Sequence, residues 1–252
     1  FGFPHEVIGR QAIKALEPEL SDRIGMAVLF PQNRSMKDPY RLVLALAERF
    51  VALGGRVERG EVTGFSRSDA MREVVLKDGR RLPADKVVIC AGAFSAKLAK
   101  DLGEPIPLET ERGYHTQIMA PGITMKHSII WPAKAFMVTP TAGGIRVGGT
   151  VEMAGLDAPP DYRRAKITVK RAKEALPNLR CEEFTEWMGH RPALPDTVPI
   201  LSASAKTKGL FYATGHGHLG LTYAATTARL MGELISGAKP AVDLHPYRVN
   251  RF

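Results

Sequence analysis

The chain has 252 residues, 44% of them hydrophobic and 24% charged, a balance typical of a soluble globular protein. Its net charge is +9, but the lysines and arginines are scattered without a basic tract. This pattern argues against nucleic-acid binding and is compatible with attraction to an anionic membrane surface. No apolar run approaches the roughly 20 residues of a membrane-spanning helix, and no signal peptide is identified. We therefore expect a cytoplasmic protein, either free or peripheral on the inner face of the membrane.

The first predicted element is a helix over residues 37–55. Asp38 is a suitable N-cap, Pro39 suits the first helical position, and Gly54 and Gly55 end the pattern. Four of its apolar residues fall on one face of the helix. That face consists of Leu42, Leu46, Phe50 and Leu53.

A strand over 56–68 and a hairpin turning at Asp78–Gly79 follow the helix. The run "KVVICAG", residues 86–92, predicts a short strand covered on both faces, so Cys90 is expected to be buried. The chain contains only two cysteines, Cys90 and Cys181, and this small number favours a protein of a reducing compartment. A second helix is predicted from Phe94 to Leu102. This order is typical of a doubly wound α/β sheet.

From Pro105 onward, segments rich in Val, Ile, Thr and aromatic residues predict a mixed or antiparallel sheet, interrupted by one helix over 163–176. The chain then returns to a short apolar strand, "GLFYATG", followed by a glycine-rich turn and another helix. Glycine lets a ligand approach the backbone, although it also serves in tight turns that bind nothing. Because "KVVICAG" also ends in a small residue and glycine before a helix, the two strand ends favour one shared ligand site.

Five segments carry a resemblance to a known family: "VVICAGAFS", "ERGYH", "GIRVGGTVE", "WMGHRPALPDTVPIL" and "TGHGHLGLTYA". Over essentially its whole length the chain resembles the flavin-dependent D-amino acid oxidases and dehydrogenases, particularly the bacterial D-amino acid dehydrogenases. The resemblance implies FAD as cofactor and a small amino acid as substrate. The electron acceptor, oxygen or a quinone, stays open.

Members of that family begin with a βαβ unit whose G-x-G-x-x-G holds the FAD pyrophosphate. We expect this chain to lack the motif and to be a C-terminal portion without the N-terminal FAD-binding segment. FAD is then expected in the full-length protein, and this chain alone is expected to retain little or none. The implied fold is α/β (α+β): a partial FAD-binding, doubly wound lobe at 24–104 and 184–237, a substrate lobe with a mixed or antiparallel sheet at 105–183, and a tail at 238–252.

Arg191, in the "RP" pair with Pro192, resembles the arginine that binds the substrate's α-carboxylate in amino acid oxidases. Its planar guanidinium suits a carboxylate. The alternative is a structural arginine paired with Asp196 or a nearby glutamate. Tyr114 and His218 are further candidates for substrate contact, each with a purely structural alternative.

The resemblance also implies cofactor contacts. The glycine-rich stretch resembles the family segment that passes the pyrimidine edge of the flavin, where helix N–H groups stabilise negative charge. Val62 resembles a valine whose backbone contacts adenine in the family. Ala91 and Gly92 resemble the pair of small residues that lets the sheet approach the dinucleotide. The alternative for Ala91 and Gly92 is a tightly packed strand end without a ligand. The stretch contributes Gly215, His216, Gly217, Leu219, Gly220, Leu221 and Thr222.

Other side chains receive structural or undecided roles. The histidines of the turn lack a clear third ligand, so no metal site is expected. His115 is expected to be a half-buried sheet residue, and Glu152 has no clear catalytic task. Phe136 and Met137 either line a substrate pocket or pack in the core, and Trp131 and Trp187 are predicted to be core aromatics.

The leading hypothesis is a flavoenzyme that oxidises the amine of a D-amino acid to an imine, which water hydrolyses to a 2-oxo acid. One alternative is a dehydrogenase or oxidase of secondary amines such as sarcosine, D-proline or hydroxyproline. Another is a non-catalytic binding or assembly subunit with the same fold.

Overall fold

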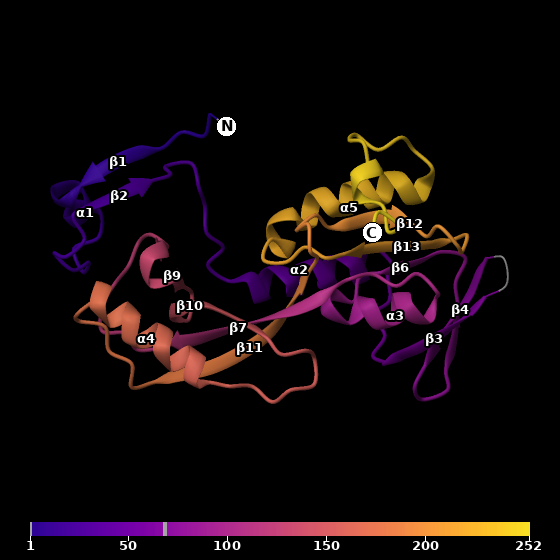
Figure 1. Ribbon diagram of the computed structural model, residues 1–252, viewed down its shortest axis with the longest axis horizontal. Helices are drawn as coiled ribbons and strands as arrows, with labels where there is room; N and C mark the ends of the chain where they lie inside the picture. Colours follow the sequence, from indigo (N-terminus) through magenta and orange to yellow (C-terminus); the bar gives the residue numbers. More distant parts are fainter. Residues whose placement is uncertain (1, 68–69) are drawn as a thin grey trace. The chain divides into compact units, whose positions relative to one another are not determined.

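The computed structural model describes residues 2–67 and 70–252 (Figure 1). They form two compact units, each assembled from separate stretches of the chain. The units divide the chain at different residues from the lobes predicted above, and the assignment of one lobe to FAD and the other to the substrate stays a prediction. The first unit comprises Phe1–Val57, Gly113–Val151 and Pro159–Gly189, and the second comprises Glu58–Arg112, Glu152–Ala158 and His190–Phe252.

A five-stranded sheet has the strand order β11-β7-β10-β9-β8. Strand β9 pairs antiparallel with both β8 and β10, as predicted for this part of the chain. Helix α4, Arg163–Ala175, contributes Ala172 and Ala175 to the same hydrophobic cluster as residues of β9 and β10. The strands are β7 (Glu109–Ile118), β8 (Ile129–Trp131), β9 (Phe136–Thr141), β10 (Gly144–Met153) and β11 (Phe184–Ala193).

The first unit also contains the N-terminal elements: β1 (Glu6–Gly9), α1 (Arg10–Leu16), β2 (Met26–Leu29) and α2 (Pro39–Ala52). The predicted N-cap of α2 is confirmed, because Asp38 Oδ1 accepts the N–H of Arg41 at 2.9 Å. The apolar face of α2 is largely exposed in the described structure. No residue of α2 is buried, and Phe50 is 51% exposed.

In the second unit, a three-stranded sheet lies between two helical layers. Strand β13 (Leu210–Thr214) pairs antiparallel with β12 (Ile200–Ala203) and parallel with β6 (Val87–Ile89). One face packs on α5 (Gly220–Ser236) and the other on α3 (Ser95–Asp101) (Figure 1). Helices on both faces of a sheet with parallel strands confirm the predicted α/β class.

Each face of this sheet has its own hydrophobic cluster because successive side chains of a strand point to opposite faces. Phe211 packs toward Leu230 and Met231 of α5, whereas Leu210 and Tyr212 pack with Ala99 of α3. Burying such apolar side chains contributes about 1.5–3 kcal/mol each. The alternation therefore holds both helical layers onto one sheet.

A separate antiparallel sheet contains β3 (Val62–Arg67), β4 (Met71–Leu76) and β5 (Arg81–Pro83). Its predicted hairpin is confirmed: Val75 pairs with Arg81, and Gly79 has a φ of +87°, a conformation that glycine adopts readily. The predicted strand over 56–68 begins only at Val62, and its last residue, Ser68, lies outside the described residues. The 3₁₀ turns are Gly92–Phe94, Pro132–Lys134 and His245–Tyr247.

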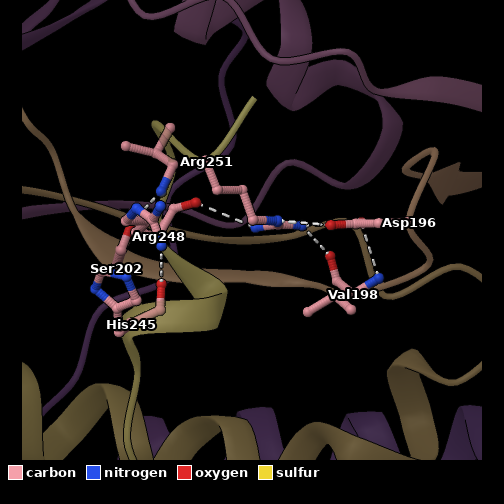
Figure 2. Close-up of polar contacts among 7 residues, drawn as sticks. Asp196, Val198, Ser202, His245, Arg248 and Arg251 are labelled. Atoms are coloured by element: carbon pink, nitrogen blue, oxygen red, sulfur yellow. Dashed lines mark hydrogen bonds and ion pairs between the residues drawn. The ribbon is translucent and has the colours of Figure 1, made fainter.

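The last residues, predicted as a tail, pack against the second unit (Figure 2). Val249 is 4% exposed and donates its N–H to Ser202 Oγ at 3.0 Å. Arg251 donates from Nε to Asp196 Oδ2 at 2.8 Å and also donates to the carbonyl of Val198. These contacts attach the C-terminal segment to β12 and to the loop that precedes it.

Two predictions of burial are wrong. Cys90 is exposed, because β6 ends at Ile89 and lies at the edge of its three-stranded sheet. Trp187 is 57% exposed, and its ring lies 5.2 Å from that of His115. Phe136 is a core residue at 2% exposure, and Trp131 packs against the same core cluster.

Candidate functional site

The ends of two parallel strands meet in the second unit. The register pairs Tyr212 of β13 with Ile89 of β6, so Gly92 and Gly215 follow neighbouring strand ends. Thr214 Oγ1 joins them by donating a hydrogen bond to the carbonyl of Gly92 at 3.1 Å. The carboxyl ends of parallel strands are the usual place for ligands in open α/β sheets. The two small-residue turns predicted from the sequence are therefore side by side.

The first glycine of the turn after β13 is required by packing. Gly215 has a φ of +81°, and a Cβ added there would lie 2.2 Å from Leu194 Cδ1. Any larger residue would displace Leu194, which belongs to the core. At this position the purely structural explanation of the glycine is sufficient.

The second glycine is different. Gly217 has a φ of +52°, and a Cβ added there would meet no heavy atom of the described chain within 4 Å. Gly92 has the same two properties, with a φ of +54°. Gly217 also donates its N–H to the carbonyl of Pro192 at 2.8 Å, which ties the turn to the strand that carries Arg191. Open space at Gly92 and Gly217 leaves room for a ligand near the backbone.

Helix α5 begins immediately after this turn. Its N-cap, Leu219, provides no side-chain cap. In the described part of the chain, the N–H groups of Gly220, Leu221 and Thr222 have no hydrogen-bond partner. Unpaired N–H groups at a helix start, together with the helix dipole, favour a negatively charged group. These are three of the residues predicted to contact the cofactor.

The expectation that the chain lacks G-x-G-x-x-G is wrong. Gly215, Gly217 and Gly220 have this spacing, between strand β13 and helix α5. In a dinucleotide-binding βαβ unit the helix leads to a further parallel strand of the same sheet. Here α5 is followed among the described elements only by a 3₁₀ turn at His245–Tyr247. The spacing is present, but the described elements around it do not form a βαβ unit.

Arg191 lies on β11, which is the neighbour of β7 in the five-stranded sheet. Its side chain is partly buried, and its Nη1 is buried without a hydrogen-bond partner in the described structure. Burial lowers the pKa of Arg191 from its ordinary value, while the negative charge of Glu111 acts in the opposite direction. A guanidinium remains charged despite such a shift, so Nη1 is a buried, charged donor without an acceptor among the described residues.

The proposed structural partner of Arg191 is occupied. Asp196 is bound by Arg251, whose Nε and Nη2 donate to its two carboxylate oxygens at 2.8 and 3.1 Å (Figure 2). This hydrogen bond from Arg251 is the main cause that lowers the pKa of Asp196. No hydrogen bond or ion pair joins Arg191 to Asp196 among the described residues, and the nearby glutamate of the structural alternative is Glu111, whose charge favours the charged form of Arg191.

Glu111 is a functional candidate that the sequence analysis missed. Its Oε2 accepts a hydrogen bond from His218 Nε2 at 2.8 Å, across 107 positions of sequence. The alternation in β7 contained a signal, because Arg112 and Tyr114 are buried while Glu111 points to the other, less buried face. His218 is thus anchored beside a carboxylate. Its role in substrate binding stays a prediction.

His216, the other histidine of the turn, is partly buried, and its Nε2 lies 3.0 Å from Thr227 Oγ1 of α5. Burial lowers the pKa of His216 below its ordinary value of 6.5. The imidazole is therefore neutral at pH 7 and fastens the turn to the helix. Among the described residues, no group of three or more His, Cys, Asp or Glu side chains is arranged to hold a metal ion.

Two further predicted contact residues, Tyr114 and Val62, have structural partners of their own. Tyr114 is 1% exposed, and its hydroxyl accepts the N–H of Asp161 at 3.0 Å, which gives it a structural partner in the first unit. Val62 begins β3 in the separate antiparallel sheet and pairs with Leu76. Substrate contact by Tyr114 and adenine contact by Val62 stay predictions.

Glu152, for which the sequence suggested no catalytic task, forms an ion pair with a buried arginine. Its Oε2 lies 3.5 Å from Nε of Arg112, a side chain that is 0% exposed. Breaking a buried pair leaves an uncompensated charge and is strongly destabilising. Stability of the second unit is therefore the evident role of Glu152.

Residues 1–234 match the family model described as "DAO: FAD dependent oxidoreductase". The chain belongs to this family. Full-length members depend on FAD. Within the described ranges, no helix is both long and apolar enough to cross a membrane.

Two curated relatives are longer than this chain. It is 36% identical over 240 residues to a D-amino-acid oxidase of Bradyrhizobium diazoefficiens, covering 94% of this chain and 57% of that protein. It is 30% identical to a D-amino acid dehydrogenase of Rhizobium johnstonii, covering 100% of this chain and 61% of that protein. The chain thus spans about three fifths of the length of these relatives.

Solved structures share the fold. Glycine oxidase from Geobacillus kaustophilus matches with a TM-score of 0.87 and 22% identity, over 100% of this chain and 68% of that one. Iminodiacetate oxidase from Chelativorans sp. BNC1 matches with a TM-score of 0.85 and 24% identity, over 97% and 67%. At these identities the matches establish the architecture and leave the substrate open.

Proposed function

We propose that this chain is part of a flavoenzyme that oxidises the amine of a D-amino acid to an imine, which water hydrolyses to a 2-oxo acid. The observation that carries the proposal is the partly buried guanidinium of Arg191. Its Nη1 is unpartnered among the described residues, and the next residue, Pro192, is hydrogen-bonded to the turn before α5. The two named relatives support an amino acid as the substrate.

Arg191 binds the substrate carboxylate in this proposal. The guanidinium presents parallel N–H donors in a plane, which match the two oxygens of a carboxylate. Because Arg191 is partly desolvated, its attraction for an anion is stronger than that of an exposed arginine. Pro192 restricts the backbone directly after it. The carboxylate thus fixes the orientation of the amino acid.

The residues of this chain fit a flavin in part. Gly92 and Gly217 leave open space beside the backbone, and the three free N–H groups of α5 suit an electron-rich, partly anionic ring edge. Ala91 and the rest of the stretch from Gly215 to Thr222 complete this proposed contact. Bound flavin supplies the two-electron acceptor. No βαβ unit among the described elements holds the pyrophosphate, so that part of the cofactor needs a segment outside this chain.

The test uses the complete open reading frame that encodes this chain. The purified protein is mixed anaerobically with D-alanine, L-alanine, sarcosine and D-proline in turn. Loss of the oxidised-flavin absorbance with D-alanine, together with pyruvate and ammonia as products, is the expected result. Reduction by sarcosine or D-proline alone would replace the proposal with a secondary-amine enzyme. Bound flavin that no amine reduces would favour a non-catalytic subunit.

A further inference from the structure

We propose that Glu111 binds the α-ammonium group of the substrate and makes the site selective for zwitterionic amino acids over 2-hydroxy acids. This inference rests on the proposed function, because it assumes that Arg191 binds the carboxylate of the same ligand. It assigns a role to the first residue of the segment "ERGYH", which the sequence analysis left without one.

Glu111 is attached at one oxygen and available at the other. Its Oε2 accepts the hydrogen bond from His218, while the described residues provide no second hydrogen bond or ion pair for this carboxylate. The side chain is 29% exposed, so a ligand can reach it without unfolding the strand. A carboxylate has about four lone-pair sites, and one histidine leaves most of them unused.

Glu111 and Arg191 carry opposite charges on neighbouring strands, β7 and β11. The charge of Glu111 favours the charged form of Arg191, yet no ion pair within 4.0 Å joins these two described residues. Each therefore keeps a donor or acceptor for something else: Nη1 of Arg191 is unpartnered among the described residues, and Glu111 is held by His218. A cation and an anion that are close but not paired match a zwitterion.

An α-amino acid places its carboxylate and ammonium on one carbon atom, so both charges arrive together. With Arg191 on the carboxylate, the ammonium adds a charge-assisted hydrogen bond to Glu111, which is roughly twice as strong as a neutral one. A 2-hydroxy acid offers only a neutral hydroxyl, and a simple carboxylic acid offers no donor at all. The negative charge of Glu111 also repels the carboxylate of each of these ligands, and neither ligand carries an ammonium group to compensate.

The experiment compares wild-type protein, Glu111→Gln and the control Glu109→Gln in the complete, flavin-loaded protein. Glutamine removes the charge, but its amide oxygen still accepts the hydrogen bond from His218. Glu109 is in the same strand, and its Oε1 already accepts the neighbouring N–H of Thr110 at 2.8 Å. Dissociation constants are measured by anaerobic titration calorimetry for D-alanine, D-lactate and propanoate, all at one pH, with the flavin reduced by dithionite beforehand so that no ligand can be oxidised. For D-alanine, binding is separated from turnover by also measuring KM and kcat.

We expect wild-type protein to bind D-alanine more tightly than propanoate. Glu111→Gln should raise the dissociation constant of D-alanine about 10- to 100-fold, because it removes a hydrogen bond between charged groups. Binding of D-lactate and propanoate should stay equal or become tighter, and KM for D-alanine should rise more than kcat falls. Glu109→Gln should change each constant less than about threefold, since it removes a charge without removing a ligand contact.

Two results would overturn the assignment. Unchanged discrimination between D-alanine and propanoate in Glu111→Gln would show that Glu111 does not touch the ammonium. Equal weakening of all three ligands would show that it acts only by holding His218 or Arg191 in place. Failure of the proposed function is a separate outcome: discrimination would then be present and depend on Glu111, but no amine would reduce the flavin.

Discussion

Replacing Arg191 with lysine tests the carboxylate clamp, because lysine keeps the positive charge and loses the planar pair of donors. Nη1 of Arg191 is buried and unpartnered in the described structure, so the donor that is lost is one that has no structural use. A hydrogen bond to a charged group is worth about 1.5–3 kcal/mol. That range corresponds to a loss of roughly 10- to 150-fold in kcat/KM for D-alanine.

The assay measures kcat/KM for D-alanine and for D-alanine amide with the complete wild-type and Arg191→Lys proteins. The amide lacks the carboxylate, so its rate should change little in the mutant, and the flavin content and melting temperature should also stay the same. Equal losses for the two substrates would refute the reasoning. The carboxylate would then be bound elsewhere, and Arg191 would hold structure or flavin.

Three further predictions follow from the same unit. Gly215→Ala should lower the free energy of unfolding by at least about 2 kcal/mol in urea titrations, because the new methyl group overlaps Leu194 and the positive φ is strained. Gly217→Ala introduces the same strain without an overlap and should lower the free energy of unfolding clearly less. Equal losses in the two variants would contradict the packing argument. The hydrogen bond from Arg251 lowers the pKa of Asp196 in the folded protein. The pair therefore contributes its full stability at pH values above the ordinary Asp pKa, and this contribution is lost as the pH falls through the lowered pKa of the folded state. Melting temperatures should therefore show a smaller loss between pH 5 and about pH 3 in Asp196→Asn than in wild type. The 252-residue chain by itself should purify colourless or weakly yellow, whereas the complete protein should carry about one equivalent of FAD; stoichiometric FAD in the short chain would contradict the need for a further phosphate-binding segment.

Part of the candidate site was predictable from sequence because its signals are local. A strand that ends in small residues and leads into a helix marks Ala91, Gly92 and the turn at Gly215, and the parallel pairing of β6 with β13 brings these ends together. Arg191 was predicted from its motif. Asp196 is near Arg191 in sequence, but its carboxylate binds Arg251, which lies 55 positions further along the chain.

The sequence by itself determined the elements whose signals lie within a few residues. Asp38 and Pro39 start α2, and Gly79 closes the hairpin between β4 and β5, because capping and turn conformations depend on neighbours in the chain. Which faces of those elements are buried was decided only by the tertiary structure. The periodicity of α2 predicts an apolar face, yet burial needs a partner surface, and among the described residues α2 has none that buries it.

The same reason separates Glu111 from the residues found by motif. Glu111 opens the segment "ERGYH", but the segment alone suggests no role for it, and the role proposed here depends on a hydrogen bond to His218 that spans 107 positions. Cys90 and Trp187 were misjudged for the converse reason: an apolar stretch predicts burial on average, but exposure depends on which strand lies at a sheet edge and on what covers it. The propensity to form a helix, strand or turn depends on adjacent residues. Burial and side-chain pairing depend on segments that are distant in sequence and come together only in the folded chain.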